Sequence, residues 1–161
     1  LEAALAFEEA LESHRMATDN DPAIFGNQFV MNEKDEVVSE FAPLLIAATD
    51  LWMGEAVEMV RSFGGVIYPA HIDRDSNGII AMLGDIPPEY GFTAMEYRDG
   101  EKREAYEALY AEAKGKSVLV SSDAHQLYKI SEAENCFPFE VDEGATPEEI
   151  RARIFAYIQK S

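Results

Sequence analysis

The chain has 161 residues, of which 47% are apolar and 11% aromatic, and this composition predicts one folded domain over residues 1–161 and excludes a disordered chain. Its 13 basic and 31 acidic residues leave a formal charge of −18, which disfavours nucleic acid and anionic membranes as partners. A single cysteine excludes an intrachain disulfide, and no apolar run approaches the length of a membrane span, so we expect a cytoplasmic protein.

The first third of the chain predicts helices around a hairpin. Residues 2–15 are strong helix formers and predict a helix. A β-hairpin is expected at residues 27–41, where two apolar stretches flank a polar turn. Residues 44–46 fit either a short buried helix or a short strand. Residues 56–63 carry apolar side chains on one helical face, and the glycine pair at 64–65 predicts the end of that helix.

From residue 66 onward, apolar runs that predict strands alternate with amphipathic stretches that predict helices. In chain order we expect a strand at 66–69, a helix at 76–84, a strand at 93–97, a helix at 103–114, strands at 117–121 and 137–141, and a helix that begins with a Thr-Pro-Glu-Glu capping box at 146–149. Strands joined by helices run parallel in one sheet, so the predicted fold class is α/β. The carboxyl ends of such strands meet at one edge.

Polar residues follow three of these strands. His71 comes after the first, Glu96 ends the second, and Asp123 and His125 follow the third. Carboxylate and imidazole together suit zinc, manganese or iron. Asp123 and His125 alone would fit a helix cap and a hydrogen-bonded loop histidine. With His71 at the same edge, a metal site becomes the favoured interpretation.

Two further residues near this edge have more than one interpretation. Arg74 is suited to hold a substrate phosphate through its planar guanidinium group, and the alternative is an ion pair with Asp73 or Asp75. Asp73 itself is expected to be a solvated loop charge. Glu96 fits a metal ligand, a residue that supports a ligand, or a solvated carboxylate. A serine hydrolase is excluded because no G-x-S-x-G turn occurs.

Two segments of the chain resemble a known family. Residues 69–74 (Pro-Ala-His-Ile-Asp-Arg) and 121–125 (Ser-Ser-Asp-Ala-His) resemble the third and fourth motifs of the PHP (polymerase and histidinol phosphatase) superfamily. Residues 26–31 and 64–65 also resemble a subgroup of small stand-alone members. The resemblance implies a distorted, TIM-like (β/α)7 barrel that holds two or three divalent metal ions at its strand ends and hydrolyses phosphoesters. It implies that His71, Asp123 and His125 bind metal and that Arg74 contacts the phosphate.

The first two motifs of the family, a His-x-His and a second motif with a His and a bridging Glu, do not occur in the chain. The resemblance covers roughly the carboxyl-terminal two-thirds of such a domain. We therefore expect a PHP-like domain without its amino-terminal strands and helices, which are absent, removed by proteolysis or present as another chain. By itself this piece is expected to be inactive.

The leading functional hypothesis is a metal-dependent phosphoesterase that acts on a small phosphorylated substrate, with neither nucleic acid nor membrane as partner. The alternative is a non-catalytic partial barrel that serves in binding or oligomerisation, with structural His and Asp residues. A nuclease is less favoured, because the charge is −18 and no basic stripe is present.

Overall fold

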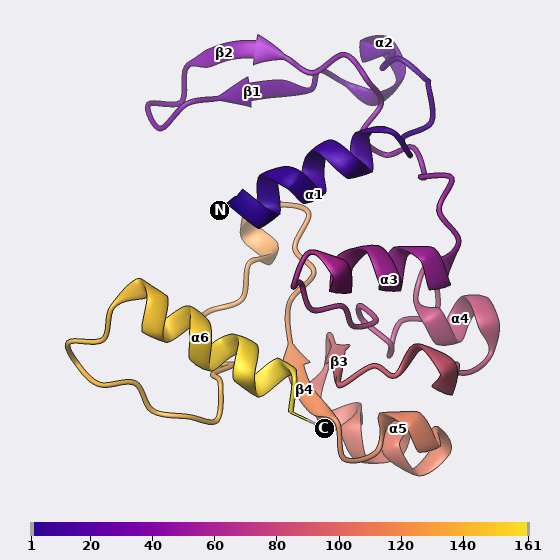
Figure 1. Cartoon of the computed structure of the whole chain (residues 1–161), viewed down its shortest axis with the longest axis vertical. Helices are drawn as coiled ribbons and strands as arrows, with labels where there is room; N and C mark the ends of the chain where they lie inside the picture. The colour runs from indigo at the N-terminus through magenta and orange to yellow at the C-terminus, as the bar shows by residue number, and fades with distance from the viewer. Residues whose placement is uncertain (1, 161) are drawn as a thin grey trace. The chain divides into compact units, whose positions relative to one another are not determined.

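The computed structural model describes residues 2–160, which form two compact units, Leu1–Phe63 and Gly64–Ser161 (Figure 1). The single domain expected over residues 1–161 stays a prediction. No helix within the described residues is long and apolar enough to cross a membrane.

The first unit consists of helices and one hairpin. Its elements are α1 (Glu2–Glu12), α2 (Pro22–Phe25), β1 (Phe29–Met31), β2 (Val37–Glu40) and α3 (Met53–Ser62). The strands β1 and β2 pair antiparallel, which confirms the predicted hairpin. Residues 44–46 form neither helix nor strand but a turn. Gly64 follows α3 with φ of +74°, a conformation that glycine adopts without strain, so the predicted helix end is confirmed.

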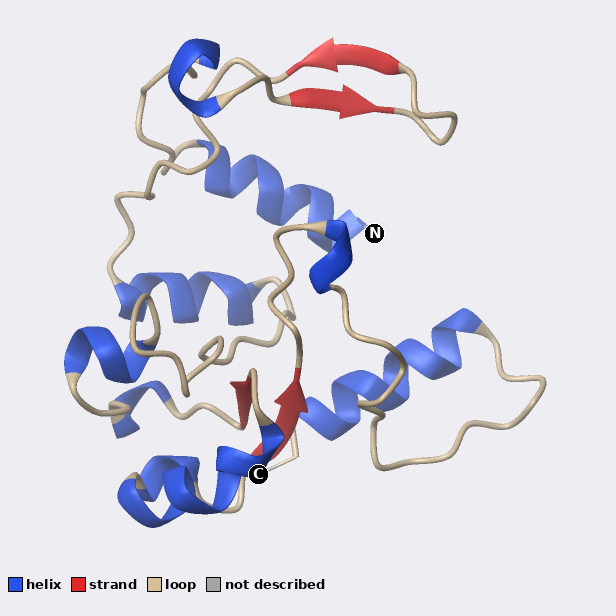
Figure 2. Ribbon diagram, turned by 180° about the vertical axis from the view of Figure 1, so that it is seen from behind, coloured by secondary structure: helices blue, strands red, loops and turns tan. Residues whose placement is uncertain are grey.

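The second unit contains the parallel strands on which the candidate site depends. Its helices and strands are α4 (Ile79–Leu83), β3 (Ala94–Tyr97), α5 (Arg103–Leu109), β4 (Ser117–Val120) and α6 (Pro147–Ile158), with short 3-10 turns η1 (Pro88–Tyr90), η2 (Gly100–Lys102), η3 (Ala111–Ala113) and η4 (Leu127–Lys129). β3 and β4 lie side by side (Figure 2) and pair in parallel, with Ala94 opposite Ser117 and Tyr97 opposite Val120. The α/β class with parallel strands is thus confirmed. The described residues form two two-stranded sheets and no closed barrel.

Two of the predicted strands do not form. Residues 66–69 and 137–141 are irregular. Proline lacks the N–H that a sheet ladder requires, and each segment contains one, Pro69 and Pro138. Pro69 still accepts a hydrogen bond at its carbonyl from the N–H of Glu96 at 3.2 Å. Residues 66–69 therefore reach β3 without becoming a strand.

The core of the second unit surrounds β3. Ala94, Met95 and Tyr97 are fully buried on this strand, and Ile72 and Ile86 are buried in the same unit. Burying side chains of this size contributes roughly 1.5–3 kcal/mol each. The strand that positions the candidate site is therefore deeply buried within the unit.

Helix α6 closes the open side of β4. Its capping box is present, with Thr146 accepting from the N–H of Glu149 and the Glu149 carboxylate accepting from the N–H of Thr146, as predicted. The hydroxyl of Tyr157 accepts from the N–H of Val118 at 3.1 Å and donates to its carbonyl at 2.9 Å. One side chain thus satisfies both backbone groups of a β4 residue.

Candidate functional site

The predicted site residues lie on two loops at the carboxyl end of the parallel pair. The N–H of Ile72 donates to the carbonyl of Glu96 at 2.9 Å, which holds the loop that carries His71 against β3. β4 ends at Val120, opposite the last residue of β3, and leads directly into the loop with Asp123. Sequence reasoning placed these residues at one edge, and the backbone pairing brings both loops there.

Asp123 is the centre of this group. Nη1 of Arg74 donates to its Oδ2 at 2.6 Å, and Nε2 of His125 lies 3.2 Å from its Oδ1. The Asp123 side chain is 20% exposed and that of His125 is 79% exposed. Desolvation of the carboxyl group raises its pKa, but the fields of His125, His71 and Arg74 together outweigh this, and the pKa of Asp123 lies below its ordinary value. The carboxylate is therefore held ionised.

His71 is placed by its backbone and by a close glycine. Its N–H donates to Oε1 of Glu96 at 3.3 Å. Its ring nitrogen Nδ1 is buried and has no hydrogen-bond partner within residues 2–160. Gly78 packs so closely that a Cβ there would stand 3.0 Å from the His71 carbonyl oxygen and 3.7 Å from Nδ1. An unpartnered buried polar nitrogen is costly, which makes this atom a candidate ligand.

Both loops carry a residue in the left-handed region of backbone conformation. His71 has φ of +33° and Asp123 has φ of +49°. For residues other than glycine such conformations are uncommon and cost on the order of 1–3 kcal/mol each. Strain of this kind is concentrated at functional sites, and here it falls on two of the three predicted metal ligands.

Asp73 has a structural role that the sequence did not reveal. It is 3% exposed, and its two carboxylate oxygens accept from the N–H groups of Arg98 at 2.8 Å and Asp99 at 3.0 Å. The ammonium group of Lys102 lies 4.0 Å from the same carboxylate. The expectation of a solvated loop charge was wrong, because Asp73 binds the backbone that follows β3. Within residues 2–160, Arg74 forms its ion pair with Asp123 rather than with Asp73 or Asp75.

Glu96 accepts a hydrogen bond from the backbone of His71 and contributes to the raised pKa of Tyr68. Its carboxylate accepts from the His71 N–H, so it supports the loop rather than the imidazole ring. Burial, and secondly the charge of Glu96, raises the pKa of Tyr68 above its ordinary value.

The imidazole and carboxylate groups of His71, Asp123 and His125 are of the types that bind divalent metal ions. His71 Nδ1 is an unpartnered buried donor, and Asp123 is an ionised carboxylate beside His125, a mixture that suits zinc, manganese or iron. Within residues 2–160, however, no group of three or more His, Cys, Asp or Glu side chains is gathered so that it could hold one ion. The Asp123 carboxylate is shared instead between Arg74 and His125.

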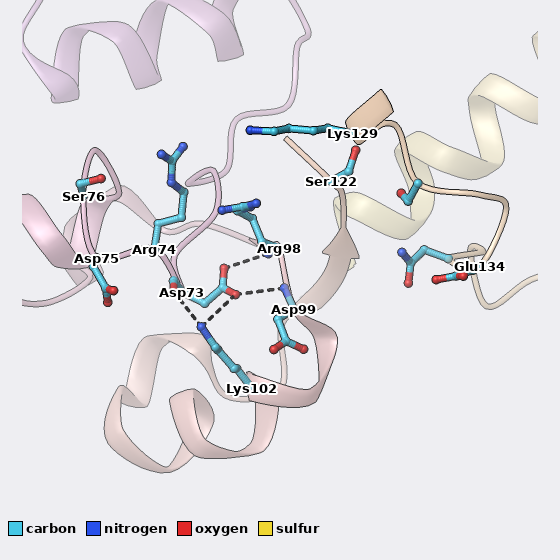
Figure 3. A pocket seen from close by; sticks show the side chains of 12 residues that line it. Asp73, Arg74, Asp75, Ser76, Arg98, Asp99, Lys102, Ser122, Lys129 and Glu134 are labelled. Carbon is cyan, nitrogen blue, oxygen red and sulfur yellow. Dashed lines mark hydrogen bonds and ion pairs between the residues drawn. The ribbon is translucent and has the colours of Figure 1, made fainter. Parts of the chain in front are cut away.

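A cavity of about 740 Å³ adjoins these residues (Figure 3). Arg74 and Ser122 line it on the side of Asp123, and further basic residues line the remainder: Arg98, Lys102 and Lys129. Sequence reasoning missed these three. Arg98 and Lys102 follow the carboxyl end of β3, a position that could have identified them, whereas Lys129 lies in η4, for which the sequence carries no signal.

Comparison of the chain with models of protein families, with curated proteins and with solved structures found no match.

Proposed function

We propose that this chain contributes to a metal-dependent phosphoesterase that hydrolyses a small phosphomonoester. The observation that carries the proposal is the convergence of Arg74, His125 and the field of His71 on the single ionised carboxylate of Asp123. A carboxylate, two imidazoles and a guanidinium at one sheet edge are the groups that binding of a cation and a phosphate would require. The resemblance of residues 69–74 and 121–125 to the PHP motifs supports the same proposal.

Each side chain has a role in the proposal. His71, Asp123 and His125 would hold a divalent ion, whose chemistry is to lower the pKa of a bound water and to polarise phosphoryl oxygens. Arg74 would bind the phosphate through its guanidinium group, which already lies at this carboxylate. Glu96 keeps the backbone of His71 in place. The parallel pair β3–β4 would be part of a distorted (β/α)7 barrel, in which further residues complete the ligand set.

Metal content and hydrolysis test the proposal together. The 161-residue chain and the complete product of its gene are assayed for stoichiometric Zn, Mn or Fe and for phosphomonoesterase activity with added Mn²⁺ or Zn²⁺. We expect metal-dependent activity in the complete product, reduced at least about a hundredfold by His125→Ala. His14→Ala is the matched control, because His14 also pairs with an aspartate, Asp50, at 2.8 Å. Absence of metal-dependent activity from the complete product would remove the enzyme hypothesis.

A non-catalytic binding module is the second candidate, favoured by one observation. Each oxygen of the Asp123 carboxylate already has a partner, the Arg74 guanidinium on Oδ2 and the His125 imidazole on Oδ1, as in a structural ion pair. If no transition metal purifies with the complete product and none can be loaded, this second candidate is preferred.

A further inference from the structure

The cavity beside Asp123 concentrates positive charge in an acidic protein. Four of the chain's 13 basic residues line it, together with only four of its 31 acidic residues. The lining is formally neutral, whereas the whole chain carries −18. A locally reduced negative potential of this kind is what an anionic ligand requires.

Two of these basic groups have no carboxylate partner. The guanidinium of Arg98 and the ammonium of Lys129 take part in no ion pair with any residue from 2 to 160, and both side chains are exposed. Figure 3 shows their head groups directed toward the same part of the cavity as that of Arg74, with Asp75 and Glu134 to either side. These charges are therefore available to a ligand.

Two of the four acidic residues that line the cavity, Asp73 and Asp99, already accept hydrogen bonds from backbone N–H groups. Both oxygens of Asp73 accept backbone N–H groups, and Oδ1 of Asp99 accepts from the N–H of Glu101 at 3.0 Å. Lys102 approaches Asp73 from the side opposite the cavity's free cations (Figure 3). Hydrogen bonds to these carboxylates disperse their charge, so they compete less with a bound anion.

The cavity and the proposed phosphoester site are continuous through Arg74. This residue lines the cavity and donates to Asp123, and Ser122, the neighbour of Asp123, lines it as well. A volume of about 740 Å³ lies within the roughly 300–1,000 Å³ of pockets that hold small molecules. A molecule with one end at Asp123 can therefore extend to Arg98 and Lys129.

We infer that this cavity binds a second anionic group of the substrate, held by Arg98 and Lys129, so that the substrate is a small phosphomonoester that carries another oxyanion, a phosphate or a carboxylate. The position of the scissile phosphate rests on the proposed function. Binding of an oxyanion by Arg98 and Lys129 does not, because it needs neither metal nor hydrolysis.

Calorimetric titration of the chain in the presence of a chelator tests the inference. The probes are inorganic phosphate, pyrophosphate with two phosphoryl groups, and phosphonoacetate with a phosphonate and a carboxylate. At least one two-anion probe is expected to bind more tightly than phosphate, and added salt is expected to weaken that binding. If pyrophosphate binds more tightly than phosphonoacetate, the second anionic group of the substrate is a phosphate; if phosphonoacetate binds more tightly, that group is a carboxylate.

Single substitutions locate the binding. Arg98→Gln and Lys129→Gln are each expected to lower the affinity for the two-anion probe about tenfold, since each substitution removes one charged hydrogen-bond donor. Both residues are exposed and unpaired, so folding should be preserved, which circular dichroism checks. Lys114→Gln, an exposed residue outside the cavity lining, makes the same charge change and serves as control.

The outcomes separate this inference from the proposed function. Equal weakening by Lys114→Gln and Arg98→Gln, or equal affinity for phosphate and both two-anion probes, would overturn the cavity inference even if the protein proves to be a metal-dependent phosphoesterase. Binding that depends on Arg98 and Lys129 supports it, and the metal and hydrolysis assays then decide the proposed function separately.

Discussion

Nη1 of Arg74 donates a 2.6 Å hydrogen bond to Oδ2 of Asp123, and this contact joins two loops that are 49 residues apart in sequence. Under the proposed function, a metal ion held by Asp123 would compete with Arg74 for this oxygen. The guanidinium therefore either neutralises the carboxylate permanently, as in a structural ion pair, or exchanges it for a phosphate when ligands bind. The two possibilities differ in what removal of Arg74 does.

The substitution Arg74→Gln is expected to leave the affinity for Mn²⁺ unchanged or higher, because it frees a carboxylate oxygen of Asp123 and removes a nearby positive charge. The KM for a phosphomonoester should rise about tenfold or more, because a charged phosphate contact is lost. Calorimetry and steady-state kinetics on the complete gene product measure both. Arg151→Gln, which breaks the exposed pair with Glu148, is the control. If Arg74→Gln loses as much affinity for metal as Asp123→Asn does, Arg74 does not simply change its partner from Asp123 to a phosphate when ligands bind.

Asp73→Asn is expected to lower the free energy of unfolding by about 1–3 kcal/mol. The amide can accept only one of the two N–H groups that the carboxylate now accepts, and its NH₂ would face the other inside a buried site. Urea denaturation measures the difference. Asp75→Asn, two residues away and exposed, is the matched control and should change stability by less than about 0.5 kcal/mol. Equal effects of the two substitutions would show that the bonds of Asp73 are unimportant.

The sequence predicted those elements whose signals are local. The hairpin, the helix end at Gly64, the capping box at Thr146 and the strands β3 and β4 each follow from short-range patterns, and all are present. The runs around Pro69 and Pro138 are apolar enough for strands, but proline removes a ladder donor, and that local chemistry outweighed the hydrophobic pattern.

The candidate site was predictable only in part. The rule that parallel strand ends share an edge placed Arg74 and Asp123 in the same region. It could not identify the partner of Arg74, because charge pairing among several nearby aspartates depends on side-chain direction. For the same reason, the sequence did not distinguish the buried Asp73 from the exposed Asp75.

Gly78→Ala is expected to lower the free energy of unfolding by about 1 kcal/mol or more. The added methyl group would stand 3.0 Å from the carbonyl oxygen of His71, so the loop must move. If His71 binds metal, the same shift should weaken metal binding, which calorimetry measures beside urea denaturation. Gly144→Ala is the control, because a Cβ there has no atom within 4 Å. An effect on metal binding from Gly144→Ala as large as that from Gly78→Ala would rule out the contact as the cause.

Ionisation of Tyr97 is expected to make the free energy of unfolding depend on pH in the alkaline range. The side chain of Tyr97 is fully buried, and its hydroxyl has no hydrogen-bond partner in the described part of the chain. Burial, and then the charge of Glu107, outweighs the opposing charge of Arg103 and raises the pKa of Tyr97 to about 12. The folded state therefore favours the neutral phenol. That contribution is complete below the unfolded pKa of roughly 10 and is lost as pH rises from there to about 12.

Tyr97→Phe removes a buried hydroxyl that has no partner, so at neutral pH it should leave the free energy of unfolding unchanged or raise it by up to about 1 kcal/mol. Between roughly pH 10 and 12 the variant should lose less stability than the wild type, because it has no phenol to ionise at this position. Urea denaturation across this range measures both effects. Tyr97→Ala, which should cost about 3–5 kcal/mol, verifies that the ring itself is packed. A Tyr97→Phe variant that is clearly destabilised at neutral pH would show that the hydroxyl is hydrogen-bonded after all.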